Sequence, residues 1–247
     1  MFKQQCSAIE VDLHESCKFI ETNFNKDLMD DIIAKKKLQL DQRLHNVQGQ
    51  FRLQNIRNAP KPKTICMYFG DNYFLSGYFE YYYKTNNIAK YVTDDHGDFM
   101  HQNCIAITND NILLNNQDII SADNNINIIN ILGTDLTDNT DIPGLKLEIS
   151  ENGPAKICIN IKDEMYKLNV ETLIALQIAH IKLVAEKQLG NNLRKALFTV
   201  PSDFTMRKIN AVKCAGKLVE FDQVSVINDI TAIAIAYAID VKLGTEK

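Results

Sequence analysis

The chain has 247 residues, of which 45% are hydrophobic and 23% are charged, and its formal net charge is −4 at pH 7. This length allows a large hydrophobic core, and the composition is that of a globular protein in water. The charge is not strongly basic, so direct contact with nucleic acid is not expected. The sequence has no apolar N-terminal run and no run of about 18 apolar residues, so we expect a cytoplasmic chain without membrane contact.

The N-terminal segment has helical periodicity. Apolar residues recur at spacings of three and four from Leu13 to Phe51, which predicts two amphipathic helices or one long broken helix. The Pro-containing run at residues 59–63 ends this pattern, because proline cannot donate the helical hydrogen bond. We therefore expect a helical extension over residues 1–62 and an α/β domain over residues 63–247.

Two strands joined by a short turn are expected after this boundary. The runs TICMYF, at residues 64–69, and FLSGYFEYYY, from Phe74, are rich in aromatic and β-branched residues, which favour strands. Gly70, Asp71 and Asn72 lie near the junction and are typical turn residues. The sequence therefore predicts a β-hairpin.

The middle of the chain is predicted to form short strands and turns. Strands are expected near residues 88–93 and 103–108. The Asn-rich stretch up to residue 130 is expected to form short helical turns and loops, because asparagine favours turns and helix caps. Residues 154–170 are predicted to form two strands around a polar turn. An amphipathic helix should follow and end at Gly190 as its C-terminal cap.

The C-terminal stretch has the pattern of a βαβ unit. The short apolar runs at residues 196–200 and 223–227 are separated by an amphipathic segment of helical length, and a second helix is expected from about Thr231. Because a βαβ unit makes a parallel strand pair, the chain is predicted to have an α/β fold. Such a sheet needs cover on its faces, and the N-terminal helices are expected to pack onto it.

Three sequences in this stretch resemble one known family. They are VPSDF from Val200, AVKCAGK from Ala211 and VINDITAIAIAYAID from Val226. They resemble VPAYF, ATKDAGK and IINEPTAAAIAYGLD in the nucleotide-binding domain of the seventy-kilodalton heat-shock chaperones (DnaK type). The resemblance implies the first lobe of an actin-like ATPase fold. The family's second phosphate loop and peptide-binding domain would follow Asp240, so no complete ATP site is expected.

The resemblance places the hairpin turn at the family's first phosphate loop, GIDLGTTNS. Gly70 is retained, but Tyr68 stands at the aspartate, and Asp71 and Asn72 stand at the two threonines. Asp229 stands at the glutamate of NEPTAA. Gly70, Asp71, Asn72 and Asp229 are therefore vestigial candidates for nucleotide contact. We expect ATP binding to be weak and no cofactor to be required.

The positive charge of the family's phosphate site is also replaced. The lysine of the family sequence AKRLIG corresponds to Ile129. Phosphoryl transfer depends almost entirely on positioning and electrostatics, and the aspartate and this lysine supply much of the electrostatics. The chain is therefore not expected to be an enzyme.

Aromatic residues stand where the family has residues for phosphate. Tyr68, Tyr73 and Phe74 are candidate protein-binding residues, because aromatic side chains often anchor interfaces; the alternative is that their rings fold inward. We expect a degenerate chaperone relative that acts as a protein-binding or assembly partner, associated with a J-protein or the ribosome as in the Ssz-type branch. Two alternatives are the first part of a split or truncated chaperone ATPase, and a scaffold whose N-terminal helices bind the partner.

Overall fold

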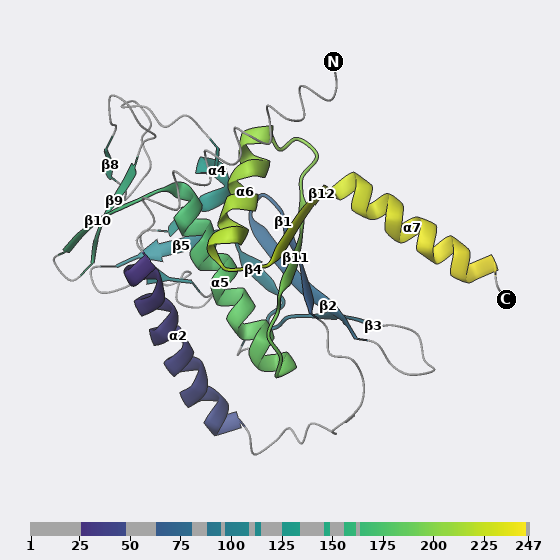
Figure 1. Cartoon of the computed structure of the whole chain (residues 1–247), viewed down its shortest axis with the longest axis horizontal. Coiled ribbons are helices and arrows are strands. Elements are labelled where there is room, and N and C mark those ends of the chain that lie inside the picture. The colour runs from purple at the N-terminus through teal and green to yellow at the C-terminus, as the bar shows by residue number, and fades with distance from the viewer. Residues whose placement is uncertain are drawn as a thin grey trace.

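The computed structural model describes residues 26–47, 63–80, 88–94, 97–108, 112–114, 125–133, 146–148, 156–161 and 164–245. Its centre is a sheet with two helices packed together beside it, α5 (Val170–Leu189) and α6 (Met206–Leu218). Helix α7 (Asp229–Thr245) extends away from the edge of this sheet (Figure 1). Of the helices in the described ranges, none is both long enough and apolar enough to cross a lipid bilayer.

The central sheet has the order β12-β11-β1-β2-β3, and β4 also pairs with β2. These strands are β1 (Thr64–Phe69), β2 (Tyr73–Glu80), β3 (Ile88–Tyr91), β4 (Met100–Gln102), β11 (Lys195–Val200) and β12 (Gln223–Asn228). β1, β11 and β12 are parallel, and β2 returns antiparallel to β1. The predicted α/β fold, the hairpin and the βαβ unit are confirmed.

Two smaller antiparallel sheets flank the central one. The first, called here the small sheet, has the order β6-β5-β7 and consists of β5 (Cys104–Ile107), β6 (Ile112–Leu113) and β7 (Asn125–Asn127). The second has the order β10-β9-β8 and consists of β8 (Lys146–Glu148), β9 (Lys156–Ile161) and β10 (Glu164–Leu168). The two strands predicted within residues 154–170 are therefore confirmed.

The Asn-rich stretch contains strands that the sequence did not predict. Short helical turns and loops were expected, but Ile112 lies in β6 and Ile126 in β7, and both side chains are buried. Pairing with β5 and burial of these isoleucines outweigh the turn preference of the asparagines. Helix α4 (Ile128–Ile131) is the one helical turn in the described part of this stretch.

Burial alternates along the strands of the central sheet. On β1, the side chains of Ile65, Met67 and Phe69 are buried, whereas those of Cys66 and Tyr68 are half-buried. β11 alternates in register with β1. Because successive side chains of a strand point to opposite faces, the sheet has a buried inner face and a half-exposed outer face.

Helix α5 lies at the centre of the hydrophobic core. Leu173, Ile174 and Leu176 are at most 1% exposed, as expected for a helix surrounded by other elements. The helix ends at Gly190, whose φ of 58° is left-handed and whose N–H donates to the carbonyl oxygen of Glu186. The predicted C-terminal cap at Gly190 is confirmed.

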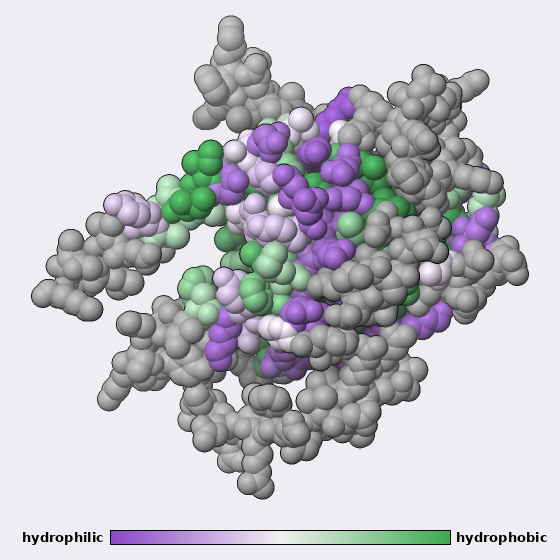
Figure 2. Space-filling model, turned by 180° about the vertical axis from the view of Figure 1, so that it is seen from behind, coloured by the Kyte–Doolittle hydropathy of each residue, from purple (hydrophilic) through white to green (hydrophobic). Residues whose placement is uncertain are grey.

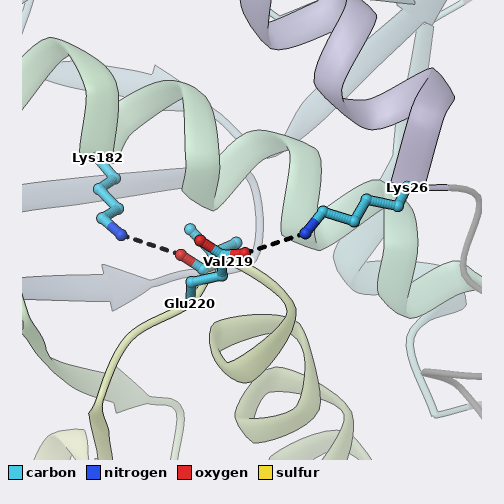
Figure 3. Close-up of polar contacts among 4 residues, drawn as sticks. All are labelled: Lys26, Lys182, Val219 and Glu220. Carbon is cyan, nitrogen blue, oxygen red and sulfur yellow. Dashed lines mark hydrogen bonds and ion pairs between the residues drawn. The ribbon is translucent and has the colours of Figure 1, made fainter.

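Helix α2 (Lys26–Val47) packs against α5. Its residues Leu28, Met29 and Ile32 are buried in the core. At one end, Lys26 Nζ lies 3.3 Å from Glu220 Oε1 (Figure 3). Packing of the N-terminal helical segment onto the α/β domain is therefore confirmed for α2.

The way in which α2 packs differs from the expectation. The sequence suggested that N-terminal helices cover a face of the sheet, but α2 lies on α5, so it forms a further layer outside the helices. The apolar surface of α5 that faces away from the sheet therefore also needs cover, and α2 supplies it. The rest of residues 1–62 lies outside the described residues, and the domain boundary at residue 62 stays a prediction.

Candidate functional site

The nucleotide-contact candidates gather at one edge of the central sheet. β1, β11 and β12 are parallel, so their C-terminal ends at Phe69, Val200 and Asn228 lie side by side. The turn at residues 70–72 continues from β1, and Asp229 follows β12. In open α/β sheets, this carboxyl edge is the usual place for a ligand.

The carbonyl groups of the turn face the small sheet. Asn103, just before β5, donates hydrogen bonds to them. Asn103 Nδ2 donates to the carbonyl oxygens of Gly70 and, at 3.0 Å, of Tyr73, which also accepts a 2.9 Å bond from the Gly70 N–H. The backbone N–H of Asn103 donates to the carbonyl oxygen of Asn72 at 3.0 Å. One residue therefore holds three of the four carbonyls from Gly70 to Tyr73.

Asn127 holds the remaining carbonyl. Its Nδ2 donates to the carbonyl oxygen of Asp71 at 2.9 Å. Its Oδ1 accepts a 3.0 Å bond from the Ile129 N–H and so caps helix α4. The same side chain therefore connects the turn to the start of α4.

The amide groups of the turn point the other way. In a planar trans peptide unit the C=O and the following N–H point in opposite directions. Because the carbonyls of Gly70 and Asp71 face the small sheet, the N–H groups of Asp71 and Asn72 face away from it. Both residues are exposed, and within the described residues neither N–H has a hydrogen-bond partner.

Tyr68 stands beside this turn. Its ring centroid lies 6.4 Å from that of Tyr73, with the ring planes at 57°. Burial raises the pKa of the Tyr68 hydroxyl, and Tyr73 and the carboxylates of Asp229 and Asp71 raise it further. At neutral pH the hydroxyl is therefore a neutral hydrogen-bonding group and not a base.

Gly70 lies close to the backbone of Tyr73 and to the ring of Tyr68. A Cβ atom at this position would lie 3.0 Å from the carbonyl oxygen of Tyr73 and 3.1 Å from Cε1 of Tyr68. Both contacts are tighter than ordinary van der Waals packing. The turn therefore has little room for a side chain at residue 70.

Phe74 does not belong to this surface. Its side chain is 3% exposed, and its ring centroid lies 6.3 Å from that of Phe69 and 5.0 Å from that of His101. Tyr73, its neighbour on β2, faces outward and is 38% exposed. The expectation that Phe74 is a surface anchor for a partner is wrong, because the strand turns this ring into the core. The role of Tyr68 and Tyr73 stays a prediction.

Two of the described residues, Ile129 and Asp71, bear on contact with a polyphosphate. Ile129, at the position where the resembled family has a lysine, is 3% exposed and part of the core. The exposed Asp71 would face an approaching polyphosphate with a like charge. Within the described residues, no group of three or more His, Cys, Asp or Glu side chains is placed to hold a metal ion.

Sequence reasoning missed the exposed apolar side chains of α7. The helix starts at the site, where Asn228 Oδ1 accepts a 2.7 Å bond from the Thr231 N–H. Ile230, Ile233 and Tyr237 are 63%, 67% and 71% exposed. Figure 2 shows hydrophobic residues on this helix, which extends at the left of the view beyond the body of the molecule. The available signal was the sequence itself, whose isoleucines and alanines leave the helix without a polar face.

Two cavities lie at the opposite edge of the sheet. Their volumes are about 230 Å³ and about 400 Å³, and both are lined by Lys182, Glu186 and Glu220. The larger one also reaches Arg194 and Asp222, which precede β11 and β12. These cavities therefore lie at the N-terminal ends of the strands and are separate from the turn and Asp229.

Comparison with known proteins gives one family. A family model described as Hsp70 protein matches residues 85–247, the greater part of the chain. The chaperone protein DnaK of Mycoplasmopsis pulmonis is 39% identical over 72 residues, which cover 29% of this chain and 12% of that protein. A heat shock cognate HSP70 protein of Trypanosoma brucei brucei is 36% identical over 95 residues, covering 38% of this chain and 14% of that protein.

Proposed function

Because the chain belongs to the Hsp70 family, we propose that it is a lobe of the family's nucleotide-binding domain that binds a protein partner and does not hydrolyse ATP by itself. Family membership confirms the resemblance found in the C-terminal sequences, and the α/β fold is that of an actin-like ATPase lobe. The match to DnaK of Mycoplasmopsis pulmonis spans only 12% of that protein. Activity, substrates and partners therefore have to be argued from the residues of this chain.

The observation that carries the proposal is Tyr68 at the carboxyl edge of the sheet. Its position corresponds by resemblance to the aspartate of GIDLG, and a neutral phenol replaces a carboxylate there. The buried Ile129 replaces a cation in the same way. Loss of one preorganised electrostatic group commonly lowers an enzymatic rate by about 10²- to 10³-fold, and two such groups are replaced.

Nucleotide contact is proposed to be weak and dispensable. The N–H groups of Asp71 and Asn72 face outward and favour an anion, whereas the Asp71 carboxylate repels one. The two effects oppose each other at the same turn. The proposed role in binding a partner requires no cofactor.

The proposed docking surface consists of Tyr68, Tyr73 and the exposed residues Ile230, Ile233 and Tyr237 of α7. The hairpin and α7, which carry these side chains, meet at the same edge of the sheet, because α7 follows β12 directly. A helix that is apolar on all sides is normally buried, and contiguous exposed apolar surface marks interaction sites. A specific interface here should bury about 1,200 Å² or more in total.

The class of partner is proposed from the degenerate branch of the family. A J-protein, a ribosome-associated factor or a larger assembly of either kind would suit a non-hydrolysing relative of the Ssz type. The alternative in which the N-terminal helices bind the partner is less favoured. In α2, the apolar residues Leu28, Met29 and Ile32 are already buried against the chain's own core.

A second candidate function is one part of a chaperone ATPase that further polypeptide completes. The turn presents two N–H groups that face outward, which favours this candidate. The two candidates differ in what they require of Asp229. If the carboxylate of Asp229 takes part in catalysis, its removal lowers turnover; under our proposal there is no turnover to lower.

The enzymatic half of the proposal is tested with the purified chain and Mg-ATP. We expect phosphate release at the rate of the buffer blank, both for the wild type and for Asp229→Ala. The exposed substitution Lys217→Ala serves as the matched preparation control, because Lys217 lies at the end of α6. Turnover above the blank that disappears in Asp229→Ala alone would establish the ATPase alternative.

The binding half is tested by purification from the native cells with quantification of stoichiometric partners. Ile233→Lys and Tyr237→Lys should each reduce recovery of the partner at least tenfold, because anchors of an interface commonly contribute about 2 kcal/mol or more. The control is Met165→Lys on β10, since Met165 is 63% exposed and far from α7 (Figure 1). Full partner recovery with both α7 variants, each folded, would refute this surface.

A further inference from the structure

We infer that Asn103 and Asn127 are positioning residues that set the conformation of the turn at residues 70–73 and so make the turn and the small sheet one mechanical unit. The inference deepens the proposed function and rests on it, because the turn joins Tyr68 to Tyr73 in the proposed docking surface. Both asparagines lie outside the central sheet, Asn103 just before β5 and Asn127 at the end of β7.

The hydrogen bonds reach every carbonyl of the turn. Asn103 supplies donors to Gly70, Asn72 and Tyr73, and Asn127 supplies the donor to Asp71. In most hairpins, by contrast, some carbonyls of the turn face water. Here the four carbonyls are all engaged, so rotation of any of these peptide units breaks a hydrogen bond. The outward direction of the Asp71 and Asn72 N–H groups follows from this arrangement.

The Asn103 side chain is fully buried against the turn. It is 0% exposed, and its Oδ1 has no hydrogen-bond partner in the described part of the chain. Burial of an unpaired amide oxygen is unfavourable. The two hydrogen bonds that Asn103 Nδ2 donates to the carbonyl oxygens of Gly70 and Tyr73 offset the free-energy cost of burying this oxygen.

Asn127 links the turn to α4, because the two polar atoms of its side-chain amide bond to different elements. Oδ1 accepts from the Ile129 N–H of α4, and Nδ2 donates to the Asp71 carbonyl. A serine at residue 127 keeps an acceptor suited to helix capping but removes the Nδ2 donor. The substitution Asn127→Ser therefore separates the positioning role from the capping role.

The aromatic pair depends on the same bonds. Tyr73 is held through its carbonyl by Asn103, and Tyr68 contacts it across the turn with 6.4 Å between ring centroids. Loosening the turn changes the relative position of these rings without removing either of them. The two asparagines therefore act on the proposed docking surface through the turn and contact no ligand themselves.

The test is amide hydrogen exchange and ¹H–¹⁵N spectroscopy of the full chain. In Asn127→Ser, the Gly70 amide should exchange about 2- to 10-fold faster, which is the factor expected for loss of one net hydrogen bond. The Asp71 and Asn72 amide resonances and the ring contacts between Tyr68 and Tyr73 should shift as well. Asn130→Ser, at an exposed residue of α4, is the matched control and should leave all of these signals unchanged.

Asn103→Ala should have a larger effect at Gly70, but its buried position makes unfolding a competing result. Asn127→Ser decides the question in that case. If Asn127→Ser leaves Gly70 exchange and the Asp71, Asn72, Tyr68 and Tyr73 signals at wild-type values, the inference is overturned. These signals report the free chain, so a failure of the partner or ATPase experiments does not affect the result.

Discussion

Lys182 donates a hydrogen bond from Nζ to the carbonyl oxygen of Val219 at 3.0 Å (Figure 3). The Lys182 ammonium also lies 4.6 Å from the centroid of the Phe221 ring. Burial lowers the pKa of Lys182, while the carboxylates of Glu186 and Glu220 act in the opposite direction. The contact ties α5 to the segment between α6 and β12. Its half-buried setting distinguishes it from the exposed ion pairs of this protein.

Replacing Lys182 should therefore destabilise the fold. In Lys182→Met the hydrophobic stem is kept, but the bond to Val219 and the contact with Phe221 are lost, so we expect a loss of about 1–2 kcal/mol in the free energy of unfolding. Chemical denaturation measures it. Lys26→Met is the control, because the ion pair of Lys26 with Glu220 is 64% and 77% exposed and should contribute less than about 1 kcal/mol. Equal losses in the two variants would contradict this expectation.

His101 should make stability depend on pH. Burial lowers the pKa of His101, although a bond to the Val92 backbone and the carboxylates of Asp94 and Asp98 oppose the shift. Because the folded state binds the proton less readily than the unfolded state, stability is complete above the unfolded pKa of about 6.5 and is lost as the pH falls below it. Urea unfolding from pH 7.5 to 5 measures the slope.

The variant His101→Phe isolates this effect. A phenylalanine keeps a ring against Phe74 but cannot take up a proton. We expect its stability to fall less steeply with decreasing pH than that of the wild type. Parallel curves for the two proteins over this range would show that His101 does not contribute to the pH dependence.

Gly216 should be intolerant of even a methyl group. A Cβ atom there would lie 2.7 Å from Cε2 of Phe198 and 3.0 Å from Cγ2 of Val224, where α6 packs on the sheet. Gly216→Ala should therefore destabilise the protein by about 1–3 kcal/mol, although alanine is the better helix former. Thermal unfolding measures it beside Lys217→Ala, an exposed neighbour. An unchanged melting temperature in Gly216→Ala would mean that α6 moves to make room.

Ile32 should report the contribution of α2. It is 2% exposed in the core, so Ile32→Ala leaves a cavity and should lower the free energy of unfolding by about 2–5 kcal/mol. Asp31→Ala, on the exposed side of the same helix, is the control. Deletion of residues 1–57 should destabilise the protein further or cause aggregation. If the shortened chain melts at the wild-type temperature, α2 serves a purpose other than stability.

The parts of the fold that follow local rules could be predicted from the sequence. The hairpin follows from two strand-forming runs around Gly70, Asp71 and Asn72, and the end of α5 follows from Gly190. The βαβ unit follows from the change between periods of two and of about four residues. In each case the preference of the segment agrees with its surroundings.

The remaining features depend on contacts between distant segments. The strand at Ile126 forms because β5 lies beside it, and the inward direction of Phe74 depends on which face of the hairpin the helices cover. Residue matching proposed Gly70 and Asp229 as candidates, and that proposal stays a prediction; it gave no sign of Asn103 and Asn127, which hold the turn. An asparagine that holds a turn more than thirty residues away cannot be recognised by spacing along the chain.

The half-exposed outer face of the sheet and the exposed side chains of α7 affect the heat capacity of unfolding. Globular proteins gain about 12–15 cal/mol/K per residue on unfolding, chiefly because apolar surface becomes hydrated. Here Cys66, Tyr68 and Leu197 are partly hydrated in the folded state, and Ile233 is largely so. The gain per residue should therefore fall below that range, which gives a flatter curve of stability against temperature. If a partner covers the proposed docking surface, its binding should show a negative heat capacity change, because the same apolar side chains then leave water.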